Sequence, residues 1–133
     1  MFLGSGSADT TISKTQIRQI LHTVLDSCTD VQRVLVIPPD YTRYHGGAGT
    51  ITRIIWEHLG SKIQAVLPAL GTHMPLTSDQ QQRMFKDIPR ELFADHLWRS
   101  DSVTIGTIGH DVINQLSEGV LSWSWPISVN RLL

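Results

Sequence analysis

Two short polar segments of this sequence carry the side chains best suited to chemistry. The first, PDYTR, holds Asp40, Thr42 and Arg43 directly after the apolar run VLVI. The second, GTH, holds Thr72 and His73 shortly after another apolar run. A guanidinium can bind a carboxylate or phosphate through two parallel hydrogen bonds. An imidazole can carry a proton near neutral pH. Together the segments suit a site that holds an anion and moves a proton.

Each segment also has a plain structural reading. Asp40 can orient Arg43, cap the following turn, or accept a hydrogen bond from a ligand hydroxyl. An Asp-x-x-Arg sequence after a strand is often only a capped turn with a surface ion pair. Most isolated loop histidines have no chemical role, so His73 alone is weak evidence for a catalytic site. The glycines at 46, 47 and 49 would let backbone amides approach an anion at the start of the next helix.

The remaining candidates give no metal site. No two histidines have the i, i+4 spacing of a helical metal site, and one cysteine cannot build a thiolate site. We therefore expect no metal to be held by this chain alone. Cys28 falls on the apolar face of the first expected helix, which predicts a buried structural thiol. His45 lies in the first loop and is able to reach a ligand there.

The composition indicates an ordinary globular protein. The chain has 133 residues, 41% of them hydrophobic and 17% charged, with a net charge of −1. This balance gives no support to nucleic-acid or membrane-surface binding, and no apolar run approaches the roughly 20 residues of a membrane span. A single cysteine excludes an internal disulfide and favours a cytoplasmic location. Residues 1–12, with the sequence GSGS, are expected to be a flexible lead-in. The apolar C-terminal segment WSWPISVNRLL is expected either to dock as a last strand or to mark a domain cut from a longer protein.

Helices and strands are expected to alternate along the chain. Capping boxes at Ser13 and Thr77 predict helix starts, and Pro38-Pro39 ends the first strand. The expected elements are a helix over 14–28, a strand over 34–37, a helix over 50–59, a strand over 63–67, a helix after Thr77, one or two helical turns behind Pro89 within 89–98, a strand over 103–108, and one or two further strands in GVLSWSW and ISVNRLL. This order predicts a single α/β domain over 13–133, with a mostly parallel, Rossmann-like sheet flanked by helices.

In a parallel sheet, ligands bind beyond the carboxyl ends of the strands. The loop with Asp40 and the loop with His73 both follow an apolar strand and precede a helix. If the two strands are neighbours, both loops lie at the same edge of the sheet. That edge is the predicted site.

The two loops together resemble the N-terminal domain of the nickel-dependent lactate racemase (LarA-like) family. That family carries an Asp-x-Thr-Arg loop and then a Gly-Thr-His-x-Pro loop, as PDYTR and ALGTHMPLT do here in the same order. PISVNRLL also resembles the segment before the family's next motif. The resemblance spans about residues 34–133. Either motif alone is unspecific, whereas the ordered pair is fairly specific.

The resemblance implies an isomerase that racemises or epimerises an α-hydroxy acid by hydride transfer to a nickel-pincer nucleotide. His73 matches one of two catalytic histidines. Asp40, Tyr41, Thr42 and Arg43 match the cofactor-binding loop, and Arg43 would also hold the substrate carboxylate. The small-molecule substrate and a downstream C-terminal domain of the same protein are the implied partners.

The sequence departs from the family pattern in two ways. Met74 follows the histidine where a basic residue is frequent, and YHGGAG follows Arg43 where a proline is common. In the family, the second catalytic histidine, the cofactor-linked lysine and the nickel-ligating histidine lie beyond this segment. We therefore expect the cofactor in the full-length parent, and no racemase activity from these 133 residues alone. The alternative is a non-enzymatic anion- or nucleotide-binding module that uses the same loops, or a structural domain in which both loops are only turns.

Overall fold

A computed structural model describes residues 6–133 of the chain. Residues 6–12 contain no helix or strand, and the rest of the expected lead-in, residues 1–5, lies outside the described part. The chain forms two compact units. One contains the residues up to Ala69 together with His73–Asp95, and the other contains Leu70–Thr72 together with His96–Leu133.

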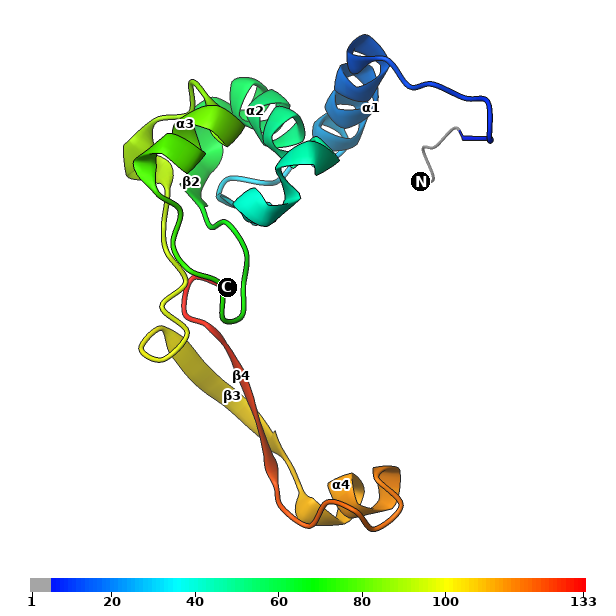
Figure 1. The fold of residues 1–133 in the computed structure, drawn as a ribbon, viewed down its shortest axis with the longest axis vertical. Helices are drawn as coiled ribbons and strands as arrows, with labels where there is room; N and C mark the ends of the chain where they lie inside the picture. The colour runs from blue at the N-terminus through cyan, green and yellow to red at the C-terminus, as the bar shows by residue number, and fades with distance from the viewer. Residues whose placement is uncertain (1–5) are drawn as a thin grey trace. The chain divides into compact units, whose positions relative to one another are not determined.

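The first unit is a mixed α/β unit of helices and one small sheet (Figure 1). Both capping boxes are confirmed: Ser13 pairs with Gln16 and Thr77 pairs with Gln80. In chain order the elements are α1 (Lys14–Asp26), β1 (Val34–Val36), the 3-10 helix η1 (Tyr41–Gly46), α2 (Ala48–Leu59), the 3-10 helix η2 (Gly60–Lys62), β2 (Ile63–Val66), α3 (Ser78–Phe85) and the 3-10 helix η3 (Arg90–Leu92).

The first helix is shorter than its apolar pattern predicts. Helix α1 ends at Asp26, and Ser27 forms its C-cap. Cys28 therefore lies beyond the helix and is exposed, so the prediction of a buried thiol is wrong. The helical periodicity fails here because the last positions of the pattern belong to the turn that follows the cap.

Strands β1 and β2 are parallel neighbours, as predicted for the two apolar runs. Val34 pairs with Ile63 and Val36 with Val66. The pairing continues past the strand ends, because the Ala69 amide donates to the Pro38 carbonyl at 2.7 Å. A proline lacks an N–H but keeps its carbonyl. Pro38 therefore ends the strand while the segment after β1 stays hydrogen-bonded to the segment after β2. The two loops that follow therefore start side by side.

The core of the first unit lies between the sheet and helices α2 and α3. Its buried residues are Ile63, Val66, Met84, Phe85 and Ile88. Helix α2 approaches α3 so closely that a Cβ on Gly49 would collide with the backbone carbonyl of Met84. The glycine at 49 thus serves helix packing, where the sequence suggested an approach to an anion.

The second unit is built on an antiparallel pair, β3 (Ser102–Ile108) and β4 (Trp125–Asn130). The expected third strand therefore exists, but it pairs with β4 and does not join β1 and β2. Helix α4 (His110–Leu116) lies in the connection between the two strands (Figure 1). The buried carboxylate of Asp101 fixes the base of the ribbon, since it accepts from the Leu97 amide at 3.2 Å and from Arg131 at 3.1 Å.

Two further expectations are met only in part. The helix expected behind Pro89 is the single turn η3, after which Val66 and Phe93 form an isolated parallel bridge. Of the one or two last strands expected, one forms: β4 begins at Trp125, the last residue of GVLSWSW, and the rest of that segment forms no strand. Within residues 6–133, no helix is long and apolar enough to cross a membrane.

Candidate functional site

The two sequence motifs meet through a direct contact between Asp40 and His73. Asp40 lies just beyond β1, and His73 lies on the loop that follows β2. Their side chains form a pair in which the Nδ1 atom of His73 lies 2.5 Å from Oδ2 of Asp40. The prediction that both loops share one edge of the parallel pair is therefore confirmed. Of the three roles suggested for Asp40, orienting Arg43 is not seen, because no ion pair joins the two side chains within the described residues.

Asp40 is held in one orientation by its own turn. Its Oδ1 atom accepts from the backbone amide of Thr42 at 3.1 Å and from the Thr42 hydroxyl at 2.5 Å, which makes it the N-cap of η1. The residue is only 7% exposed. With Oδ1 occupied by two donors, Oδ2 is the oxygen left to face His73. The capping role suggested by the sequence is confirmed, and it fixes the carboxylate for a second task.

The hydrogen bond from the Thr42 hydroxyl is the main reason that the pKa of Asp40 is lowered from its usual value of 3.8. Burial acts in the opposite direction, because it disfavours the charged form. The charge of His73, its hydrogen bond and the Thr42 amide each lower the pKa further. Asp40 is therefore a carboxylate at neutral pH, and it can only accept hydrogen bonds from its neighbours.

His73 is oriented on one side and open on the other. Because Asp40 is ionised, Nδ1 donates and the neutral ring keeps Nε2 as its free acceptor. The side chain is half exposed, which leaves room for a reacting molecule. Two residues with left-handed backbone precede it, Ala69 at φ 59° and Gly71 at φ 89°. Such a conformation is costly for an alanine, and strained positions of this kind cluster at functional sites.

The other residues of the first loop lie differently. The ring of Tyr41 is half-buried, packs against the core and lies 5.3 Å from the ring of Tyr44. Arg43 is exposed and has no carboxylate within 4.0 Å among residues 6–133. Asp40 and Thr42 bond to each other, whereas Arg43 keeps a cationic side chain that can bind an anion.

The Asp40–His73 pair can accept and return a proton. A carboxylate behind a histidine fixes its tautomer and stabilises the imidazolium that forms when it takes a proton. Sequence analysis named both residues but did not pair them. The signal was available, since an acid and a histidine each follow one of two neighbouring strands. Among residues 6–133, no group of three or more His, Cys, Asp or Glu side chains is placed to hold a metal ion.

Comparison with protein-family models found no match, and comparison with curated proteins found none either. Among solved structures, the chain is similar to a Thermotoga maritima protein whose crystal structure was determined by a structural genomics consortium. The TM-score is 0.71, the sequence identity is 26%, and the match covers 91% of this chain. The chain spans 30% of the length of that protein.

Proposed function

We propose that this chain provides the proton-transfer and anion-binding part of a lactate-racemase-like enzyme, which racemises or epimerises an α-hydroxy acid. The contact between Asp40 and His73 carries the proposal, because it joins the two motifs on which the resemblance rests. We further propose that β1 and β2 belong to a Rossmann-like sheet, that the protein is cytoplasmic, and that a downstream domain of the same protein completes the site.

His73 is assigned the role of the base that takes the proton of the substrate hydroxyl. Neutral His73 would accept this proton at Nε2 while its Nδ1–H stays bound to Asp40, which stabilises the resulting cation. Such general base catalysis contributes about 10²–10⁴-fold to a rate. Arg43 would bind the substrate carboxylate through its planar guanidinium. A hydroxyl proton and a carboxylate on neighbouring carbons are what an α-hydroxy acid offers.

The residues present fit only part of the implied nickel-pincer nucleotide. Arg43 has the free donors that an anionic group of the cofactor would need, whereas Asp40 and Thr42 are already satisfied by each other and by His73. When bound, such a cofactor supplies a hydride acceptor for the substrate carbon. This chain would supply the proton carrier and the anion contact beside it.

The test uses the enzyme that contains this chain, loaded with its cofactor and supplied with D- or L-2-hydroxy acids. Chiral chromatography should detect interconversion, and His73→Ala should lower kcat by about 10²–10⁴-fold. Arg43→Gln should mainly raise KM. His110→Ala is the control, because that histidine is exposed and, within residues 6–133, its side chain pairs with the adjacent Asp111 alone.

Two results would contradict the proposal. One is the absence of interconversion for every 2-hydroxy acid tried, and the other is an unchanged kcat in the His73→Ala enzyme. The 133 residues by themselves should show no interconversion even with added cofactor. Activity of this chain alone would show that no downstream domain is required.

A further inference from the structure

A basic cavity lies between helices α1, α2 and α3, and none of Asp40, Arg43 or His73 lines it. Its volume is about 420 Å³, within the range of small-molecule sites. Among the residues that the structure describes, no acidic side chain lines this cavity. The cationic side chains in its wall are Lys14, Arg18, Arg53, Arg83 and Lys86. The net charge of the whole chain is −1, so it does not indicate this local cluster of cations.

Most of this positive charge has no counter-charge in the protein. Arg18 forms an ion pair with Glu57 at 2.7 Å. For the other four cations, no carboxylate lies within 4.0 Å in the part of the chain that the structure describes. Like charges brought together around a cavity repel one another, and a bound anion would relieve that repulsion.

The cavity also contains donors that lack an acceptor. The Nε atom of Arg53 is buried and has no hydrogen-bond partner among residues 6–133. A buried donor without a partner is costly and points to a ligand or ion that completes it. Gly47, the N-cap of α2, lines the cavity and provides no side-chain cap for the first amides of the helix. The positive end of the α2 dipole adds to the field.

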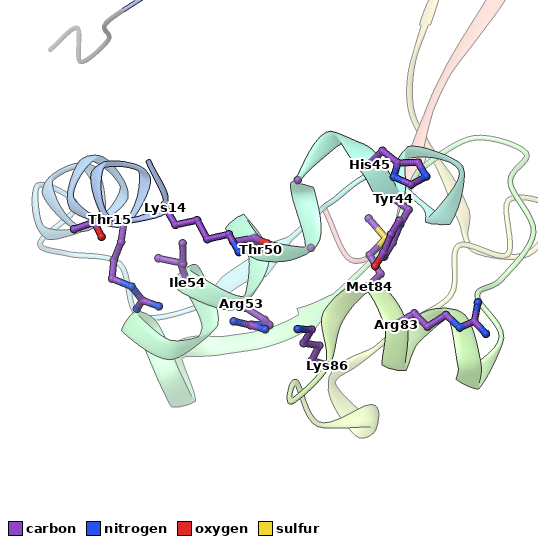
Figure 2. Close-up of a pocket in the computed structure, with 13 residues that line it drawn as sticks. Lys14, Thr15, Tyr44, His45, Thr50, Arg53, Ile54, Arg83, Met84 and Lys86 are labelled. Atoms are coloured by element: carbon purple, nitrogen blue, oxygen red, sulfur yellow. The ribbon is translucent and has the colours of Figure 1, made fainter. Parts of the chain in front are cut away.

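Figure 2 shows how the side chains are arranged. Arg53 of α2 and Lys86 at the end of α3 point toward one another, and Lys14 of α1 reaches toward Thr50 (Figure 2). Arg83 points away from this group. The site therefore centres on Lys14, Arg53 and Lys86.

We propose that this cavity binds a phosphate-bearing small molecule with at least two negative charges. A single carboxylate would leave most of the cluster uncompensated, whereas a diphosphate offers several oxygens to guanidinium, ammonium and amide donors at once. Tyr44, Ile54 and Met84 give the wall an apolar part, against which an organic group can pack. This inference is independent of the reaction assigned to His73.

The experiment is calorimetric titration of the 133-residue chain with pyrophosphate and with ADP, at low and at moderate salt. We expect saturable binding at one site and at least tenfold weaker affinity in the Arg53→Gln/Lys86→Gln variant. The matched control, Arg33→Gln/Arg90→Gln, removes the same charge from exposed positions outside this cavity and should change the affinity less than threefold.

The two ligands distinguish the source of the phosphate. Tighter binding of ADP assigns the site to an organic phosphate, and tighter binding of pyrophosphate assigns it to a free polyphosphate. In NMR spectra, the Nε–H signal of Arg53 should shift on titration, which localises the ligand even if the double variant fails to fold. The proposal is overturned if neither pyrophosphate nor ADP binds, if both double variants lose affinity equally, or if the Arg53 signal does not move.

Discussion

Replacing Asp40 with asparagine should reverse the tautomer of His73. In the native protein, Oδ1 of Asp40 receives two donors from Thr42 and Oδ2 faces Nδ1 of His73. An asparagine has one oxygen and one NH₂ group for these two positions. The backbone N–H of Thr42 can only donate, so it requires the oxygen. The NH₂ group must then face His73, whose Nδ1 becomes an acceptor while the proton moves to Nε2.

The strength of this preference follows from the cost of the opposite amide orientation. Turning the amide over would place its NH₂ group against the Thr42 N–H and leave that donor unpaired in a partly buried place. An unsatisfied buried donor costs about 1–3 kcal/mol. Because 1.36 kcal/mol corresponds to a factor of ten, the reversed tautomer should dominate by about 5–150-fold. His73 would then have no free acceptor while it is neutral.

The assay is a long-range ¹H–¹⁵N correlation spectrum of the imidazole rings, recorded at a pH where the histidines are neutral. It distinguishes a protonated from an unprotonated ring nitrogen directly. We expect Nδ1–H for His73 in the native chain and Nε2–H in Asp40→Asn. In the complete enzyme the same change should lower kcat by about 10²–10⁴-fold without loss of fold.

Asp26→Asn is the matched control for this tautomer prediction. Asp26 contacts Nε2 of His58 at 2.8 Å, but its carboxylate is two-thirds exposed and has no backbone donor that fixes its second oxygen within residues 6–133. Its amide can therefore present oxygen to His58, and the His58 tautomer should not be reversed. The reasoning fails if Nδ1 of His73 remains protonated in Asp40→Asn, or if Asp26→Asn alters the spectrum of His73.

Three further predictions concern stability. Gly49→Ala should lower the free energy of unfolding by about 1–3 kcal/mol, because its methyl group meets the Met84 carbonyl; Gly46→Ala has open space and should change it little in the same urea titration. Because the pKa of Asp40 is lowered on folding, its stabilisation is present above its unfolded value of 3.8 and is lost as the pH falls through its folded value. The destabilisation by Asp40→Asn should thus be larger at pH 7 than at pH 3, and an equal loss at both would contradict the pKa direction. Thr42→Val should lower the unfolding free energy by about 1–3 kcal/mol at pH 7 and raise the pKa of Asp40, measured by NMR titration of its carboxyl carbon.

Features set by neighbouring residues were predictable from the sequence. The capping boxes at Ser13 and Thr77 are local patterns, and both appear in the structure. The two apolar runs before the polar loops pair in parallel, which placed the loops at one edge. The later part of the chain was harder, because a strand pattern does not identify its partner. Residues 103–108 read as a third parallel strand, yet the hydrogen bonds of Ser102–Ile108 go to Trp125–Asn130.

The sequence predicted which loops form the site, but it did not predict which side chains in those loops contact each other. Asp40 and Arg43 stand three residues apart, so an ion pair between them was the natural local expectation. The actual partner of Asp40 is 33 residues further along, and it is selected by a backbone hydrogen bond between Ala69 and Pro38 that no local pattern encodes. The basic cavity could not be predicted for the same reason, since Lys14 belongs to α1, Arg53 to α2, and Lys86 is the C-cap of α3.

The geometry of the Asp40–His73 pair follows from how the parallel strands end. Pro38 and Pro39 prevent further donation from the first strand, but the Pro38 carbonyl still binds the Ala69 amide. The segment after β1 then turns into η1, where Thr42 donates a hydrogen bond to one oxygen of Asp40. The segment after β2 turns back through two residues with left-handed backbone, Ala69 and Gly71, before it reaches His73. The second oxygen of Asp40 and the imidazole are thus positioned by backbone constraints on both sides, so the orientation of His73 does not depend on a bound ligand.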